Sequence, residues 1–363
     1  MRAGKHMNHI IRFFECLLPT TQCNIACEYC YIIQEKRRNM EQIPLEYSVE
    51  NMRNALSLER LGGICYFSIC GTGETFLQKE CVPLVKALLE EGHYVNVTTN
   101  GTITSRINEL LDINPKFLHR LHFSFSFHYL ELKKRGLVDI FFDNVNNVKK
   151  HGCSFFVQVN LYDGYIPYIQ EIKYVCVNKV GAMPQVAATR FEPDGDVKSN
   201  IKLHTKLSKD EYVKIGQGFQ SPLFEFTMQN FNQKRKEFCY AGDWSFNLNL
   251  KDGNLKACYH SGKIQNIFKD TNKPIQLQAV GKHCNSLYCI NSSHFLSLGC
   301  IPELDTPPYV ELRNRPEADW YNDEMGKVLG EQFKETHKEY SVIRKVESNI
   351  RESIRKIKRK IFQ

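Results

Sequence analysis

The sequence predicts an α/β fold in which parallel strands alternate with helices, followed by a smaller cysteine-rich α+β part. Three observations lead to this prediction. Short apolar runs alternate with amphipathic stretches up to about residue 190. A polar, turn-rich segment follows, and beyond it cysteines gather around an Asp-Gly turn. Strands that alternate with helices pair in parallel, because each helix carries the chain back across the sheet.

Six strands are expected in the first part of the chain, each a short run of apolar, β-branched or aromatic residues. They occupy residues 11–18, 63–70, 94–99, 121–127, 154–160 and 182–189. Helices are expected between them, for example at residues 46–61 and 79–92. Right-handed crossovers wind such units into a barrel, a partial barrel or an open doubly wound sheet. The pattern alone leaves these three open.

The second part is expected to contain a β-hairpin. Asp252 and Gly253 stand between two alternating runs, "SFNLNL" and "NLKAC", and Asp-Gly is a preferred hairpin turn. Residues 306–320 are rich in turn formers and are expected to be irregular.

Three regions follow from these patterns. The first is a core at residues 1–205, which ends in the linker-like stretch 191–208, and the second is a cysteine-bearing domain at 206–330. The third, at 331–363, is expected to be a basic amphipathic helix from Glu331 onward. Isoleucines spaced by four, three and four residues predict this helix; they are Ile350, Ile354, Ile357 and Ile361.

Composition indicates a chain with a buried core, since 42% of its 363 residues are hydrophobic and 24% are charged. No run approaches the roughly 18 apolar residues that cross a bilayer, and the basic N-terminus lacks a secretion signal. A cytoplasmic location is therefore expected. In a reducing compartment, clustered members of the fourteen cysteines favour metal ligation over disulfides. Isolated ones such as Cys65, Cys81 and Cys176 are expected in the core.

The net charge of +8 is concentrated at the C-terminus, where residues 331–363 hold ten Lys or Arg and five Glu. Such a tail either packs on its own domain or a partner, or lies on a membrane surface. Nucleic acid is not expected as a partner, because the body of the chain is close to neutral.

Three cysteines at C-x3-C-x2-C spacing, Cys23, Cys27 and Cys30, follow the first expected strand. In a parallel barrel this is the edge where active sites are built. A complete 4Fe–4S cluster takes four cysteines, so three would leave one iron open, as in a reactive metal site. The alternative is a zinc site completed by a distant ligand.

The order of the motifs resembles the radical S-adenosylmethionine (SAM) superfamily. Its C-x3-C-x-Φ-C motif has an aromatic residue at Φ, which is Tyr29 here. A glycine-rich motif after the second strand corresponds to "GTGET" at residues 71–75, and "TTNGT" at 98–102 follows the third strand. The resemblance implies a partial (βα)6 TIM-like parallel barrel.

The resemblance also implies the cofactors, which are a 4Fe–4S cluster on the three cysteines and S-adenosylmethionine chelated to the open iron. Electron transfer from the cluster would release a 5′-deoxyadenosyl radical that abstracts hydrogen from a substrate C–H bond. The residues expected around S-adenosylmethionine are Tyr29, Gly71, Gly73, Glu74, Asn100 and Ser126. For Asn100 and Ser126 the alternative is a local turn or strand role.

A second cysteine group is similar to the SPASM and twitch auxiliary domains of this superfamily. Its C-x9-15-G-x4-C element is met by Cys239, Gly253 and Cys258, and "CNSLYC" supplies Cys284 and Cys289. These four cysteines are the expected ligands of an auxiliary 4Fe–4S cluster that takes an electron from the substrate. Cys300 would be spare or would replace one of them, and a zinc ribbon is the alternative.

His128 follows the fourth expected strand and Arg190 the sixth, so both are candidates to bind or deprotonate a substrate. Only 22 residues precede Cys23, which favours oxidation of a small-molecule or carbohydrate-like alcohol over modification of a peptide. A peptide-modifying maturase and a zinc-stabilised binding protein remain the alternatives. The expected electron donor is a low-potential protein such as flavodoxin or ferredoxin.

Overall fold

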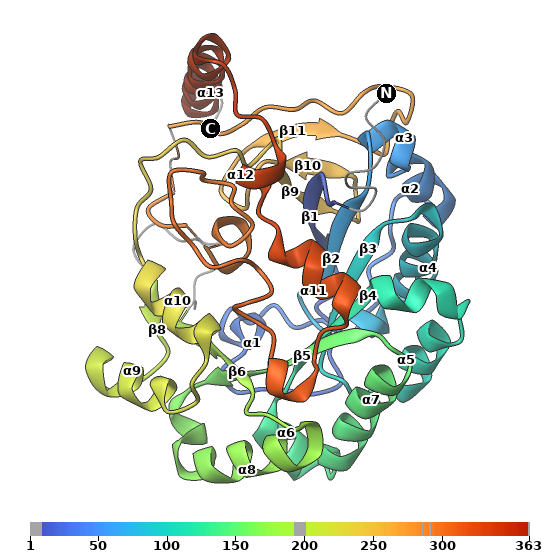
Figure 1. Ribbon diagram of the computed structural model, residues 1–363, viewed down its shortest axis with the longest axis vertical. Coiled ribbons are helices and arrows are strands. Elements are labelled where there is room, and N and C mark those ends of the chain that lie inside the picture. Colours follow the sequence, from blue (N-terminus) through green and yellow to red (C-terminus); the bar gives the residue numbers. More distant parts are fainter. Residues whose placement is uncertain (1–8, 192–200, 283, 285, 290–291, 362–363) are drawn as a thin grey trace.

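The computed structural model describes residues 9–191, 201–282, 284, 286–289 and 292–361 (Figure 1). Its centre is a curved sheet that confirms the α/β partial barrel. The strands of the barrel are β1 (Arg12–Leu18), β2 (Cys65–Gly71), β3 (Tyr94–Thr99), β4 (Leu121–Ser126), β5 (Ser154–Leu161) and β6 (Gln185–Ala188). Each is parallel to the next, as the alternation of strands and helices predicted.

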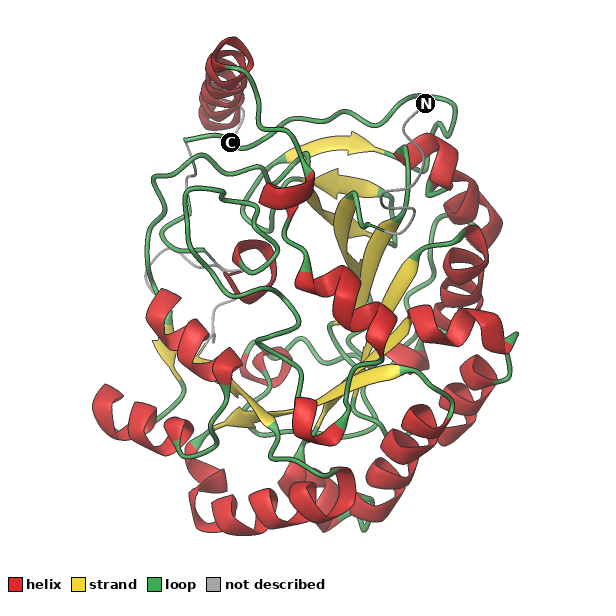
Figure 2. Cartoon of the chain, viewed as in Figure 1, coloured by secondary structure: helices red, strands yellow, loops and turns green. Residues whose placement is uncertain are grey.

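Helices cover the outer face of the sheet (Figure 2). Those between the barrel strands are α1 (Tyr31–Gln34), α2 (Val49–Ala55), α3 (Leu58–Leu61), α4 (Cys81–Glu91), α5 (Thr104–Leu111), α6 (Tyr129–Lys134), α7 (Val138–Lys150) and α8 (Ile169–Val180). The prediction of a single helix over residues 46–61 is wrong. Ser57 interrupts it, because its hydroxyl accepts a hydrogen bond from the Arg60 amide and so begins a new helix, α3.

The expected hairpin is confirmed as β9 (Ser245–Asn249) and β10 (Asn254–Lys256), which pair antiparallel. Gly253 in the turn has φ +71° and lies against the Phe268 ring, where a side chain would clash. β9 is also parallel to β1, so the hairpin and β11 (Lys263–Asn266) extend the main sheet. The domain boundaries stay predictions, and the sheet is continuous across the first of them.

The described parts of the segment that connects the core to the hairpin contain a short strand pair and two helices. These elements are β7 (Arg190–Phe191), β8 (Lys202–Leu203), α9 (Lys209–Gln217) and α10 (Pro222–Asn230). Most of the expected linker 191–208 lies outside the described residues.

Residues 306–320 are irregular, as expected, apart from one 3-10 turn at Pro316–Ala318. Several of their side chains are nevertheless buried, namely Tyr309, Leu312, Arg313, Arg315, Ala318 and Trp320. Successive residues of β1 face opposite sides of the sheet. Phe14 stacks on Phe67 and Phe246 on one side, whereas Phe13 contacts Tyr309 on the other. The backbone amide of Phe155 in β5 donates to the carbonyl of Trp320. Tyr309 of this segment therefore lies on the inner face of the barrel, and in Figure 1 the segment crosses in front of the strands. Trp320 packs on Phe155 and donates its indole N–H to the Val180 carbonyl at the end of α8.

The tail is helical only in part, so the prediction of a helix from Glu331 onward needs correction. The chain forms α11 (Asp323–Gly330), one turn at α12 (Phe333–Thr336) and a long helix, α13 (Val342–Ile361). Within the described ranges, no helix is both long and apolar enough to span a bilayer.

Candidate active site

The three cysteines of the first motif lie in the loop after β1 and line one cavity of about 640 Å³. The same cavity is lined by the last residues of other strands, including Gly71 of β2 and Ser126 of β4. It is therefore at the carboxyl ends of the parallel strands, where the sequence predicted the active site. All eight of the non-cysteine residues predicted for the site line it, namely Tyr29, Gly71, Gly73, Glu74, Asn100, Ser126, His128 and Arg190.

The three thiols are close enough to influence one another's ionisation. Burial raises the pKa of Cys23 to about 11, and the thiol of Cys30 contributes to this rise. Burial also raises the pKa of Cys27, with Cys23 and Cys30 as the next causes. Thiolates in such a place require a positive partner, and a metal cluster supplies one. Among the residues that the structure describes, no three His, Cys, Asp or Glu side chains are arranged around a single metal ion.

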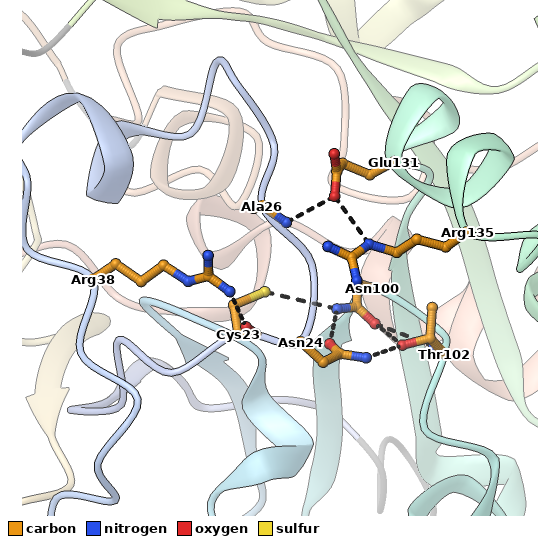
Figure 3. A network of polar contacts seen from close by, with 8 residues as sticks. All are labelled: Cys23, Asn24, Ala26, Arg38, Asn100, Thr102, Glu131 and Arg135. Carbon is orange, nitrogen blue, oxygen red and sulfur yellow. Dashed lines mark hydrogen bonds and ion pairs between the residues drawn. The ribbon is translucent and has the colours of Figure 1, made fainter.

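Asn100 connects the end of β3 to the cysteine loop (Figure 3). Its side-chain nitrogen, Nδ2, donates to Asn24 Oδ1 at 2.8 Å and lies 3.9 Å from Cys23 Sγ. Its carbonyl oxygen accepts hydrogen bonds from the amide and hydroxyl of Thr102, and that hydroxyl also accepts from Asn24. Asn100 thus positions the loop through its own side chain, and its proposed contact with S-adenosylmethionine stays a prediction.

Two charged residues that sequence reasoning missed, Glu131 and Arg38, hold the backbone of the cysteine loop. Glu131 at the start of α6 accepts a hydrogen bond from the Ala26 amide at 3.0 Å and pairs with Arg135 at 3.1 Å (Figure 3). Arg38 donates to the Cys23 carbonyl at 2.7 Å. For Glu131, the only sequence signal was its spacing of four residues from Arg135 on a helix.

Gly73 brings the glycine-rich loop against the backbone that precedes Cys23. Its amide donates to the Thr20 carbonyl at 2.7 Å, and the next amide, of Glu74, donates to Gln22 at 2.8 Å. A Cβ on Gly73 would lie 2.1 Å from the Gln22 carbonyl oxygen, so only glycine fits. In the structure this glycine allows a close approach between two protein loops, whereas its predicted place beside S-adenosylmethionine stays a prediction.

Glu74 is 2% exposed, and protein donors engage both of its oxygens. They accept hydrogen bonds from the Thr99 hydroxyl and the Asn100 amide, each at 2.7 Å, and from the Phe76 amide at 3.1 Å. Burial raises its pKa, and these hydrogen bonds act in the opposite direction. Glu74 therefore joins the ends of β2 and β3.

Tyr29, which is buried, and His128, which is half-buried, form a pair in the cavity wall. The Tyr29 hydroxyl is 2.6 Å from His128 Nδ1 and 3.1 Å from the hydroxyl of Tyr165. Burial lowers the pKa of His128 to about 4, although nearby Glu131 raises it. The imidazole is therefore neutral at neutral pH and able to accept a proton.

Comparison with known families agrees with this geometry. Residues 17–165, from the end of β1 to beyond β5, match the model of the radical SAM superfamily. This part of the chain is a radical SAM domain. No curated protein matches the chain.

Three solved structures are similar to the chain at low identity. Streptococcus suis SuiB bound to S-adenosylmethionine is 15% identical, with a TM-score of 0.49 over 74% of this chain and 67% of SuiB. The enzyme anSMEcpe with bound AdoMet is 14% identical, with a TM-score of 0.49 over 94% of this chain and 97% of that one. BtrN in complex with AdoMet and 2-DOIA is 15% identical, with a TM-score of 0.36 over 91% of this chain and 92% of BtrN.

The cofactors of the radical SAM domain are a 4Fe–4S cluster and S-adenosylmethionine. The residues fit both. Cys23, Cys27 and Cys30 offer three thiols on one cavity wall, and the cavity beside them is within the size range of cofactor pockets. These three cysteines are one ligand fewer than a closed cluster takes.

The second cysteine group also gathers in space. Burial raises the pKa of Cys239, and the thiols of Cys284, Cys289 and Cys300 add to the rise. Cys284 has a similar influence on Cys258, whose pKa is raised to about 11. The four predicted ligands are therefore neighbours, although their role stays a prediction.

Cys300 lies with this group but differs from it in its surroundings. It is fully buried, its thiol donates to the Ser245 hydroxyl at 3.4 Å, and burial raises its pKa to about 12. A thiol that already has a hydrogen-bond acceptor inside the sheet is less suited to ligation than its half-buried neighbours. Of the two predicted alternatives, this favours a spare Cys300 over one that replaces a ligand, and the choice stays a prediction.

The cavity of the radical SAM domain reaches the second cysteine group. Its wall includes Tyr259, which follows Cys258, together with Tyr288 and Cys289. Arg190 lines it as well, and the Arg190 carbonyl accepts a hydrogen bond from Gln34 at 3.1 Å. One cavity therefore adjoins both cysteine groups.

Proposed function

We propose that the chain is a radical SAM enzyme that oxidises an alcohol carbon of a small or carbohydrate-like substrate. The first cysteine group would hold the S-adenosylmethionine-binding cluster. The second group, Cys239, Cys258, Cys284 and Cys289, would hold an auxiliary 4Fe–4S cluster that receives the substrate's electron. The cavity that adjoins both groups is the observation that carries the proposal.

The chemistry that the bound cofactors supply is reductive cleavage of S-adenosylmethionine to methionine and a 5′-deoxyadenosyl radical, which takes one hydrogen atom from the substrate. To become a carbonyl, the same carbon must then lose one electron and the hydroxyl its proton. One electron therefore enters at the first cysteine group in each turnover, and one electron leaves the substrate through the second group. A low-potential flavodoxin or ferredoxin is the proposed donor.

His128 is the proposed proton acceptor and Arg190 the proposed substrate-binding residue. His128 lines the cavity, and its neutral imidazole is oriented by the hydrogen bond with Tyr29. An oriented, neutral imidazole can accept a hydrogen bond from the hydroxyl and its proton as the carbonyl forms, although as a weak base, because burial disfavours the imidazolium. Arg190, the first residue of β7, lines the same cavity, and its guanidinium is suited to bind a polar substrate.

The size of the cavity limits how much of a substrate can reach the site. S-adenosylmethionine is itself drug-sized and must share about 640 Å³ with the substrate. The space that is left suits a monosaccharide-sized molecule or one side chain of a peptide. Peptide modification is therefore the alternative function, and an experiment must distinguish it from oxidation of a small alcohol.

The first test is anaerobic incubation of the reconstituted protein with S-adenosylmethionine and a strong reductant, with 5′-deoxyadenosine as the readout. About eight iron and eight sulfide per chain are expected, against zinc for a binding protein. Cys30→Ser should abolish nucleoside formation, while Cys176→Ser, at a buried cysteine of α8, should leave it unchanged. An iron-loaded wild type that forms no nucleoside would refute the proposal.

The second test separates the substrates. Sugars and cyclic alcohols that carry deuterium on the carbinol carbon are compared with deuterated peptides, and transfer of deuterium to 5′-deoxyadenosine is measured. Cys289→Ser should still form the nucleoside but lose about tenfold or more of the carbonyl product. Transfer from peptides alone would favour the maturase alternative.

A further inference from the structure

The C-terminal helix α13 packs on the rest of the chain through its polar side. The Ser348 hydroxyl donates to the Ala279 carbonyl at 2.7 Å, and Asn349 Oδ1 accepts from the Lys282 amide at 3.0 Å. Glu352, one turn further along, is 6% exposed. Gly281 has no side chain, which leaves the space that Asn349 occupies. These contacts fix which face of the helix points inward.

The opposite side of α13 is apolar and exposed. Its aliphatic residues are three or four positions apart, so they form one stripe along the helix. The exposed fractions are 73% for Ile343, 51% for Val346, 54% for Ile350 and 48% for Ile354. A helix that packs on its own domain normally buries such a stripe, whereas α13 leaves it exposed.

The charge of α13 indicates what covers the stripe. Between Val342 and Ile361 the sequence has eight Lys or Arg and two Glu, a net charge of +6. Arg344 and Arg351 are among the exposed residues of the described part. Pairing of two copies through the stripe would bring two such sets of cations together. An anionic surface that accepts aliphatic side chains matches both features.

We propose that the exposed stripe of α13, defined by Ile343, Val346, Ile350 and Ile354, docks the enzyme on the surface of an anionic lipid bilayer. The isoleucines would enter the boundary between headgroups and acyl chains, and the arginines and lysines would lie at the headgroup phosphates. The helix would lie in the plane of the surface, with its polar side still attached to the Ala279–Lys282 segment. This role is independent of the proposed chemistry.

The test is co-sedimentation of the full reconstituted chain with vesicles of phosphatidylcholine that contain about 30% phosphatidylserine. Binding is expected to the anionic vesicles, to weaken strongly with added salt, and to be absent with pure phosphatidylcholine. Ile350→Ser and Ile354→Ser should each weaken binding by about tenfold. Ile140→Ser is the matched control, because Ile140 is 40% exposed on α7, far from α13 in Figure 1.

Each outcome decides the proposal. Absence of binding to the anionic vesicles would overturn it, and so would binding that the two stripe variants leave unchanged. Sedimentation velocity over a range of protein concentrations supplies a second readout. A dimer that the stripe variants dissociate, without vesicle binding, would assign the stripe to a second copy of the chain and also overturn the proposal.

Discussion

Glu15 of β1 is a buried carboxyl group inside the barrel, and its replacement gives a quantitative test of the structure. Only 5% of Glu15 is exposed, and its Oε2 has no hydrogen-bond partner among the described residues. Burial raises its pKa to about 7, and the nearby Arg313 guanidinium opposes the rise without cancelling it. The neutral form of Glu15 is therefore the one that the fold favours.

The sign and size of the effect follow from the pKa. In the unfolded chain the carboxyl titrates near 4.5, and in the folded chain near 7. Between these values the folded state holds the proton and the unfolded state does not, so the free energy of unfolding falls as pH rises. The shift in pKa corresponds to a loss of about 3 kcal/mol in the free energy of unfolding. This loss is absent below the lower pKa and complete above the upper one.

Glu15→Gln removes the ionisation while it keeps the shape of the side chain. The new amide adds a constant cost, because its donors also lack partners, but that cost cancels when two pH values are compared. Between about pH 5 and about pH 8 the wild type should lose about 3 kcal/mol more stability than the variant. For a chain of 363 residues this is a difference of about 4 °C in the melting temperature.

The assay is anaerobic differential scanning fluorimetry of both proteins at equal scan rate across this pH range. Glu41→Gln is the control, since Glu41 is exposed in a loop and should follow the wild type. If the melting temperatures of the wild type and Glu15→Gln changed equally with pH, the reasoning would be refuted. They would mean that Glu15 reaches water or a partner in the folded chain.

Three further predictions concern the site and the core. Gly73→Ala should weaken S-adenosylmethionine binding by at least about tenfold in equilibrium dialysis, because its Cβ would lie 2.1 Å from the Gln22 carbonyl oxygen and displace the cysteine loop. Cys300→Ala should keep the full iron content in a colorimetric assay, whereas Cys258→Ala should lose about four iron per chain, and equal losses would make Cys300 a ligand. Phe14→Ala should lower the free energy of unfolding by about 3–5 kcal/mol in urea titrations of the reduced chain, because Phe14 is fully buried; a loss under about 1 kcal/mol would contradict that packing.

Much of the fold and of the site could be predicted from local sequence. The expected strand at residues 94–99 coincides with β3, and the Asp-Gly turn correctly placed the β9–β10 hairpin. The cysteine triad, "GTGET" and "TTNGT", taken in order, resemble the radical SAM superfamily, and the match of residues 17–165 to that family agrees with them. These features are readable because strand period, turn conformation and ligand spacing are each set within a few neighbouring residues.

Other features were decided only by the tertiary structure, because they depend on contacts between residues far apart in the chain. Glu131 supports the cysteine loop from a helix 105 positions away. Tyr309 packs against Phe13 inside the barrel, and Trp320 packs on Phe155, from a stretch for which the sequence predicted only irregular structure. The isoleucines of α13 predict an amphipathic helix, but the sequence could not tell which side it buries, since that depends on the hydrogen bonds of Ser348 and Asn349 to a distant segment. Sequence thus determined the radical SAM motifs and the cofactors that they imply, and long-range packing decided how these residues are held and which side chains stay exposed.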